Sequence, residues 1–223
     1  MVPARLSAPW LAIALVALLG AQPPRAGVVQ SNGQLRVLYA VPGVLVAAVL
    51  VDGAPVAGPL AFGADTGYLF LSAGPHTIGL VAVDAAAGAA LPTADLDLGA
   101  GQAKTVLVGG TPPVALVLTN LGVAPLGGPA LVRLAHLAAG VPRLELASAG
   151  GPVLVRDVAY GDASPYADVP PGAMTLVLRP AGTDTVMADI PGAVLVSDRS
   201  YTFVAVGVPG ERPSVAILAL VDS

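Results

Sequence analysis

The sequence predicts an all-β protein made of two tandem β-sandwiches. Three observations predict this fold: short runs of β-branched and aromatic residues, turn residues (Gly, Pro, Asp and Asn) at their ends, and an almost complete lack of helical periodicity. The chain has 223 residues, with 27 Gly and 22 Pro. Its apolar runs recur about 8–12 residues apart, which is the spacing typical of sandwich strands.

Each predicted strand ends at residues that favour a turn. The run 44–51 is followed by Asp52-Gly53, a dipeptide that closes β-hairpins. The Ala-rich run 85–90 is interrupted by Gly and followed by Pro92, which predicts a loop or a single turn there. The predicted strands are 44–51, 68–71, 76–83, 105–108 and 114–119, and then 131–136, 144–147, 153–158, 174–178, 201–206 and 215–221.

An internal duplication organises the chain. Blocks of sequence recur in one order at a nearly constant offset, which indicates two copies of a unit of about 95 residues. The copies are predicted to be domains over 28–120 and 129–223, joined by a segment without periodicity or charge. The matched positions include Arg36 and Arg133, Phe62 and Tyr160, Gly63 and Gly161, Tyr68 and Tyr166, Gly74 and Gly172, and Thr105 and Thr202.

The N-terminal segment 1–21 is typical of a secretory signal peptide. Arg5 precedes an apolar run over 10–19, and small residues follow at Gly20 and Ala21. A membrane span needs roughly 20 apolar residues, so this run is too short to cross a bilayer. We therefore expect an exported protein, extracellular, periplasmic or at the cell surface, with no membrane span in the mature chain. An uncleaved signal anchor is the alternative.

Composition excludes several classes of function. Only 11% of the residues are charged, whereas about 25% is usual, and 55% are hydrophobic, which is the opposite of a disordered chain. Ten basic residues against fourteen acidic ones argue against nucleic-acid binding. With no Cys, the chain has no disulfide, thiolate metal site or thiol nucleophile.

The residues able to carry catalysis are few. His76 and His136 lie in different copies, without a Gly-x-Ser-x-Gly nucleophile motif, and we interpret both as structural. Asp157, Asp162 and Asp168 cluster in the second copy and, with His136, are the residues a metal-dependent hydrolase would use. Because Asp is also a common turn residue, we predict that the chain is not an enzyme and has no metal or cofactor site.

Two other sets of charged residues have structural interpretations. Arg36 and Arg133 occupy the same place in the two copies, and we expect such an Arg to pair with a turn carboxylate such as Asp52. Binding of an anionic sugar is the alternative. Asp95 and Asp97 alternate along a predicted edge, where charge would discourage pairing with another chain.

The candidate ligand-contact residues are four aromatic side chains. Phe62 and Tyr68 in the first copy match Tyr160 and Tyr166 in the second. Exposed together on one face, such rings could stack on sugars. Equivalent rings in both copies are also typical of core residues that fix the distance between two sheets. Both interpretations remain open at the level of the sequence.

The repeated blocks resemble a known family. The first copy reads Arg36-Val37-Leu38-Tyr39, Val51-Asp52-Gly53, Phe62-Gly63, Tyr68 and Ala73-Gly74-Pro75-His76-Thr77, and the second reads Arg133-Leu134-Ala135-His136, Tyr160-Gly161, Tyr166 and Pro170-Pro171-Gly172. This pattern resembles a bacterial exported family classed as a domain of unknown function, present here as two tandem copies. Tyr39 departs from it, since His is usual at that place. The resemblance implies an immunoglobulin-like or transthyretin-like sandwich at the cell envelope, and no activity.

These observations favour a non-catalytic function. We expect an exported structural or adhesive module of the cell envelope, whose partner is an envelope polymer or a surface protein. The alternative is a carbohydrate-binding module that recognises envelope or extracellular polysaccharide, which requires at least two of the four aromatic rings to be exposed on one face.

Overall fold

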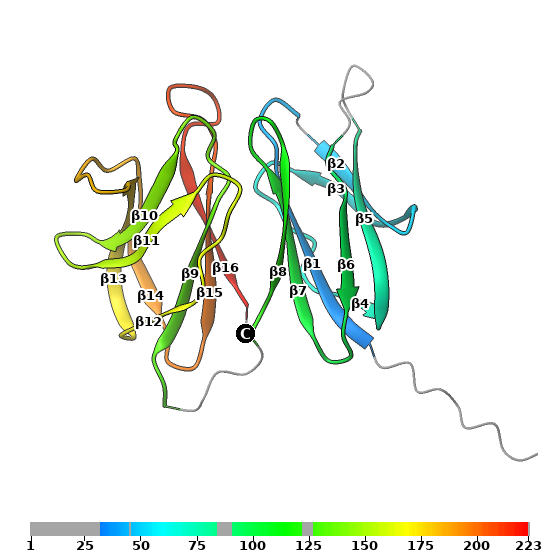
Figure 1. Ribbon diagram of the computed structural model, residues 1–223, viewed down its shortest axis with the longest axis horizontal. Coiled ribbons are helices and arrows are strands. Elements are labelled where there is room, and N and C mark those ends of the chain that lie inside the picture. The colour runs from blue at the N-terminus through cyan, green and yellow to red at the C-terminus, as the bar shows by residue number, and fades with distance from the viewer. Residues whose placement is uncertain (1–31, 45, 84–90, 122–126, 223) are drawn as a thin grey trace, which may run out of the picture.

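The computed structural model describes residues 32–44, 46–83, 91–121 and 127–222. These residues form sixteen β-strands and no helix, in two units that lie side by side (Figure 1). The predicted fold class, two tandem all-β sandwiches, is confirmed. The described part of the chain contains no helix that is long and apolar enough to cross a membrane. The predicted signal peptide (1–21) and the Ala-rich run 85–90 lie outside it.

The first unit consists of eight strands in two four-stranded sheets. The inner sheet, which faces the second unit, has the order β4-β1-β7-β8, and the outer sheet has the order β3-β2-β5-β6 (Figure 1). The strands are β1 (Asn32–Ala40), β2 (Val46–Val51), β3 (Ala54–Ala61), β4 (Leu69–Ser72), β5 (Gly74–Ala82), β6 (Ala94–Leu98), β7 (Ala103–Gly109) and β8 (Val114–Thr119).

The second unit repeats this arrangement. Its inner sheet has the order β12-β9-β15-β16 and its outer sheet the order β11-β10-β13-β14. The strands are β9 (Ala130–His136), β10 (Arg143–Ser148), β11 (Val153–Ala159), β12 (Ala167–Val169), β13 (Gly172–Pro180), β14 (Ala188–Leu195), β15 (Ser200–Val206) and β16 (Ala216–Val221).

The two units share one topology, as the sequence duplication predicts. In each unit the first strand runs parallel to the seventh, β1 beside β7 and β9 beside β15, whereas the other paired strands run antiparallel. The registers also correspond: Arg36 lies opposite Thr105, and Arg133 lies opposite Thr202. The strands of the units span 32–119 and 130–221, inside the predicted ranges 28–120 and 129–223.

Three apolar clusters hold the molecule together. Two of them fill the space between the sheets of each sandwich, with Tyr39 in the first and Phe203 in the second among their largest side chains. A third cluster lies between the units. Because it covers the other face of the inner sheets, all seven residues of β15 are buried. The four sheets therefore form four stacked layers (Figure 1).

The strands that the sequence patterns missed are mostly edge strands. β3 contains Pro55 and Pro59, and β14 contains Pro191, and each is the outermost strand of an outer sheet. Pro cannot donate a backbone hydrogen bond, so it is tolerated at an edge but argues against a strand when only the sequence is read. Asp95 and Asp97 are exposed on β6, the edge strand at the other side of the first outer sheet.

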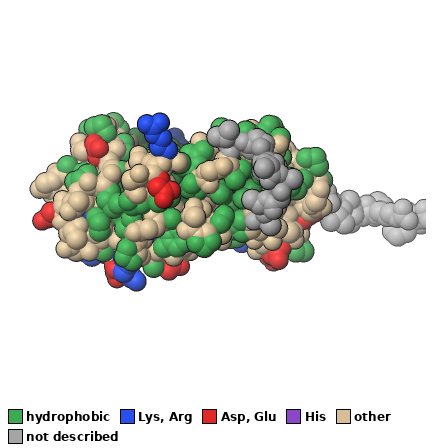
Figure 2. Space-filling model, turned by 90° about the horizontal axis from the view of Figure 1, so that it is seen from above, with side chains coloured by type: hydrophobic (Ala, Val, Ile, Leu, Met, Phe, Trp, Pro, Cys, Tyr) green, Lys and Arg blue, Asp and Glu red, His purple; other side chains and the backbone are tan. Residues whose placement is uncertain are grey.

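The outward faces of the two outer sheets differ. In the second unit Glu145 and Arg179 lie opposite each other and form an ion pair of 2.6 Å. The corresponding cross-strand pair in the first unit is Ala48 and Val81, and Val81 is 51% exposed. At this place the outer face of the first unit is apolar where that of the second is charged, although Asp95 and Asp97 are exposed on the β6 edge of the first. Figure 2 shows how few charged side chains the surface carries from above, with hydrophobic and uncharged residues over most of that face.

Candidate functional site at the contact between the two units

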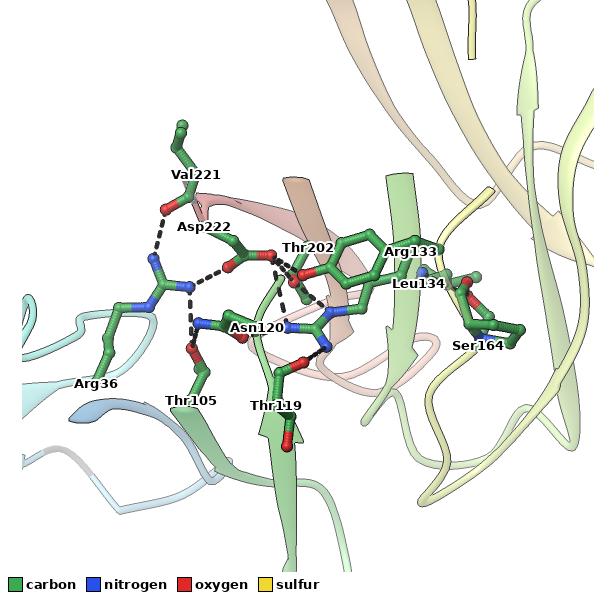
Figure 3. Close-up of polar contacts among 12 residues, drawn as sticks. Arg36, Thr105, Thr119, Asn120, Arg133, Leu134, Ser164, Thr202, Val221 and Asp222 are labelled. Atoms are coloured by element: carbon green, nitrogen blue, oxygen red, sulfur yellow. Dashed lines mark hydrogen bonds and ion pairs between the residues drawn. The ribbon is translucent and has the colours of Figure 1, made fainter. Parts of the chain in front are cut away.

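Two buried arginines, one from each unit, lie at the centre of the contact. Arg36 on β1 is 5% exposed and Arg133 on β9 is 4% exposed. Both side chains stand on the faces of the inner sheets that meet, and both guanidinium groups reach into the other unit (Figure 3). Burial of this kind requires that most of the donors find acceptors, because an unpaired charge inside a protein is costly.

Each arginine binds the end of the last strand of the other unit. Arg36 donates to the backbone oxygen of Val221 (2.9 Å) and forms an ion pair with Asp222. Arg133 donates to the backbone oxygen of Thr119 (3.0 Å) and to Oδ1 of Asn120. Asn120 and Asp222 each follow the eighth strand of their unit, and each donates its backbone N–H to the start of the seventh. The two halves of the contact are therefore reciprocal.

The equivalent tyrosines belong to this same cluster. The Tyr68 ring lies 4.8 Å from the guanidinium carbon of Arg36, and the Tyr166 ring lies 4.5 Å from that of Arg133. At this distance the electron-rich face of a ring attracts a cation. Tyr166 donates its hydroxyl hydrogen to Asp222 (2.7 Å), and Tyr68 donates to the backbone oxygen of the same residue (3.2 Å).

One chemical difference breaks the symmetry. Asp222 accepts hydrogen bonds from the hydroxyls of Tyr166 and Thr202, whereas Asn120, at the equivalent place, donates to the hydroxyls of Tyr68 (2.6 Å) and Thr105 (2.8 Å). Two guanidinium groups thus share a single carboxylate. Burial lowers the pKa of Arg133 and raises the pKa of Tyr166. Asp222 is the acceptor on which the charge balance of the cluster rests.

Apolar side chains continue the contact beyond the arginines. Tyr160 lies across Gly110 of the first unit and donates its hydroxyl hydrogen to the backbone oxygen of Pro112 (2.7 Å). Gly110 has a φ of +87°, and a Cβ added to it would overlap the Tyr160 hydroxyl. The third apolar cluster contains Leu38, Ala40, Leu107, Ala135, Leu137, Val204, Val206 and Leu220, with Phe62 and Leu218 among the half-buried residues against it.

The four predicted ligand-contact residues therefore all lie at or beside this contact. Phe62, Tyr68, Tyr160 and Tyr166 are half-buried, and none of them belongs to the core of either sandwich. The interpretation as sandwich-core residues is wrong, because the aromatic rings in those cores are others. A sugar that stacked on these rings would have to compete with the contacts they already make.

His136 is buried and neutral. Its Nε2–H donates to the backbone oxygen of Val141 (2.9 Å), and its Nδ1 accepts from the backbone N–H of Ala138 (3.3 Å). Burial lowers its pKa to about 4, although the bond to Val141 opposes that shift. Tyr39, at the equivalent place, donates to the carbonyl oxygen of Val44, also five residues further on. Tyr39 thus makes in the first unit the hydrogen bond that His136 makes in the second.

The predicted pairing of Arg36 with Asp52 is wrong. Asp52 lies in the β2–β3 turn and pairs with His76 instead, at 2.7 Å. The Arg36 side chain points away from its own outer sheet and toward the second unit. The sequence of one copy does not show that the second copy covers this face of the inner sheet. Arg36 keeps its structural role with a different carboxylate, that of Asp222.

The other predicted carboxylates do not gather around His136, although Asp157 and Asp162 line one surface pocket beside Arg143. Asp157 forms an exposed ion pair with Arg143, and Asp168 is exposed on β12. Asp162 meets His136 only through the backbone, since its carbonyl oxygen accepts the His136 N–H. Within the described residues, no group of three or more His, Asp or Glu side chains is placed to hold a metal ion.

Sequence reasoning missed Asn120 and Asp222. Asn120 is the last residue of the predicted first domain (28–120), and the sequence indicates no role for it, although it is only 5% exposed. Their positions could have identified them, because each residue directly follows the last strand of its copy. However, the number of residues that separates Asn120 from Asp222 is larger than the number that separates Tyr68 from Tyr166. A search at one constant offset does not align them.

The architecture and this contact define the class of protein: a tandem repeat of β-sandwich units that meet through their inner sheets. The chain belongs to the family described as Domain of unknown function (DUF4397), which matches residues 33–147 and 130–223. The predicted family and its two tandem copies are thereby confirmed. No curated protein matches the sequence.

Similarity to solved structures is distant. The TIE protein of Bacillus anthracis gives a TM-score of 0.27 at 10% identity over 83% of this chain, which spans only 34% of that protein. CBMbc, a family CBM26 domain of Eubacterium rectale Amy13K solved with maltoheptaose, gives a TM-score of 0.28 at 9% identity, over 85% of this chain and 97% of that one. Neither similarity is high enough to bear on function.

Proposed function

We propose that the chain is a non-catalytic, exported structural or adhesive module of the cell envelope, in which two β-sandwiches act as one rigid body. The proposal rests on the contacts that the repeated Arg and Tyr side chains make between the two units. Four of these residues join the two units, because the side chain of each contacts Asp222: Arg36, Arg133, Tyr68 and Tyr166.

The surface supports an adhesive role. On the outer face of the first unit, Ala48, Val81 and Val83 form an uncharged part over β2 and the end of β5, and Val83 is 58% exposed. The charged residues Asp95 and Asp97 of that face lie on the β6 edge. The matching face of the second unit carries the Glu145–Arg179 ion pair. Since both faces descend from one repeated unit, the fold does not require the apolar character of the first. Apolar surface that a fold does not need is typical of contact with another molecule.

A sedimentation experiment tests the proposal. The fragment from Gln22 onward is incubated with isolated cell-wall sacculi and with insoluble polysaccharides, and the bound fraction is measured after centrifugation. The matched variant is Ala48→Glu/Val81→Arg, which copies the ion pair of the second unit onto the first and should leave the fold intact. We expect saturable binding to sacculi by the wild type, and at least a tenfold loss of affinity in the variant, or about 1.4 kcal/mol.

Other outcomes decide against the proposal. Binding that soluble sugars compete away, and that the double variant keeps, would favour the carbohydrate-binding alternative and direct attention to Tyr68→Ala and Tyr166→Ala. Absence of any pelleting would contradict the adhesive role at the envelope.

A further inference from the structure

Both ring nitrogens of His76 face hydrogen-bond acceptors. Its Nδ1 lies 2.7 Å from Oδ2 of Asp52, and its Nε2 lies 2.8 Å from the backbone oxygen of Ser72. A neutral imidazole carries one N–H and can donate to only one of the two acceptors. The complete arrangement therefore requires the doubly protonated, positively charged ring, whose side chain is 9% exposed.

The two acceptors belong to different sheets of the first sandwich. Asp52 lies in the turn between β2 and β3 of the outer sheet, and Ser72 ends β4, an edge strand of the inner sheet. His76 stands on β5, close to the point where the chain crosses from one sheet to the other. Asp52 also accepts the backbone N–H of Thr77 through Oδ1 (2.9 Å), and its own N–H donates to the Thr77 carbonyl oxygen (2.9 Å). With the bond to His76, the turn is bound to β5 by three hydrogen bonds.

The charged groups around His76 are acidic. Asp52 faces it from the β2–β3 turn, and Asp97 faces it from β6, while Asp95 on the same strand accepts the hydroxyl hydrogen of Thr77 (2.6 Å). The hydrogen bond to the Ser72 carbonyl, followed by that to Asp52, raises the pKa of His76 above its usual range. In return, the Thr77 N–H and His76 lower the pKa of Asp52.

The second unit has the same fold without this arrangement. Met174 stands two residues after Gly172, as His76 stands two residues after Gly74, and the turn after β10 carries Ala149 and Gly150 in place of an acid. The sandwich topology therefore does not depend on the histidine and its acceptors.

We propose that His76 is a pH-sensitive clamp confined to the first unit. In its charged form it ties the β2–β3 turn to the end of β4, and in its neutral form it must release one of them. A His with a raised pKa contributes stability that is complete below the ordinary value of about 6.5 and is lost as the pH rises through the raised pKa. The clamp is thus closed in mildly acidic surroundings and opens in alkaline ones.

Nuclear magnetic resonance on the full chain tests the clamp directly, because the chain has only two histidines and His136→Gln assigns their signals. We expect His76 to titrate above pH 6.5, and to titrate lower in Asp52→Asn. Two sets of amides report the opening: that of Thr77 responds to release of Asp52, and those of β4 respond to release of Ser72. Hydrogen exchange of at least one of the two sets, corrected for its intrinsic pH dependence, should accelerate at least tenfold through the same titration. The amides of β13, the corresponding strand of the second unit, serve as the control and should not respond.

Two results would overturn the clamp. One is a His76 that titrates at or below 6.5 in the wild type. The other is corrected exchange that stays constant both for the Thr77 amide and for the amides of β4 while His76 loses its proton. Neither result depends on what the envelope partner is, so the clamp and the proposed adhesive function can fail separately.

Discussion

Replacing Asp222 by Asn is expected to lower the free energy of unfolding by about 3 kcal/mol, because removal of one partner of a buried ion pair leaves the other charge uncompensated. Here both Arg36 and Arg133 would lose their shared carboxylate, whose side chain has no exposed surface. The Tyr166 and Thr202 hydroxyls would also face an amide where they now donate to a carboxylate. Chemical denaturation near neutral pH measures the loss.

The reciprocal geometry supplies a matched control for this experiment. Asn120→Asp places a carboxylate beside Arg133 at the position equivalent to that of Asp222, within reach of the hydroxyls of Tyr68 and Thr105. The double variant Asn120→Asp/Asp222→Asn moves the single negative charge to the other half of the cluster. It should regain at least half of the stability that Asp222→Asn loses. An Asp222→Asn variant as stable as the wild type would show that the cluster does not hold the units together.

Acidification is expected to destabilise the protein through His136. Its pKa of about 4 in the folded chain lies below the ordinary value of 6.5. The unfolded chain therefore binds the proton first, and stability that is complete above pH 6.5 is lost as the pH falls toward 4. The difference between the two pKa values corresponds to about 3 kcal/mol.

A substitution separates His136 from the carboxylates that titrate in the same range. His136→Gln keeps a side chain that can donate to Val141 but has no proton to gain. Denaturation of both proteins between about pH 7 and pH 4 should show the wild type losing stability relative to the variant by about 3 kcal/mol. This pH dependence is opposite to that expected for His76, whose contribution to stability is lost as the pH rises. Parallel pH profiles for the two proteins would mean that His136 is not buried and neutral in the folded chain.

The sequence was sufficient for the fold class because the strand pattern is local. Apolar runs that end in turn residues, such as the run before Asp52-Gly53, need no tertiary information to be read. The patterns failed for β3 and β14, where Pro at an edge mimics a loop. An edge strand differs from a loop because it pairs with one neighbouring strand, and a single sequence does not show that strand.

The candidate site was only half predictable, for a physical reason. The duplication identified Arg36 as equivalent to Arg133, and Tyr68 as equivalent to Tyr166. It gave no sign that these side chains contact the other copy. Their partners come from the other copy, more than 180 residues away along the chain in the case of Arg36 and Asp222. Contacts between two copies of one unit leave no periodic signal within either copy, so the acceptors at the strand ends stayed hidden.

We propose that the reciprocal contact makes the two sandwiches one rigid body, and backbone ¹⁵N relaxation of the full chain tests this rigidity most directly. Amides of both units should report one common rotational diffusion tensor. Gly110→Ala, which forces the Tyr160 hydroxyl away from the contact, should loosen that coupling and serves as the comparison. Two units that tumble with separate, shorter correlation times in the wild type would show that the contact does not join them rigidly.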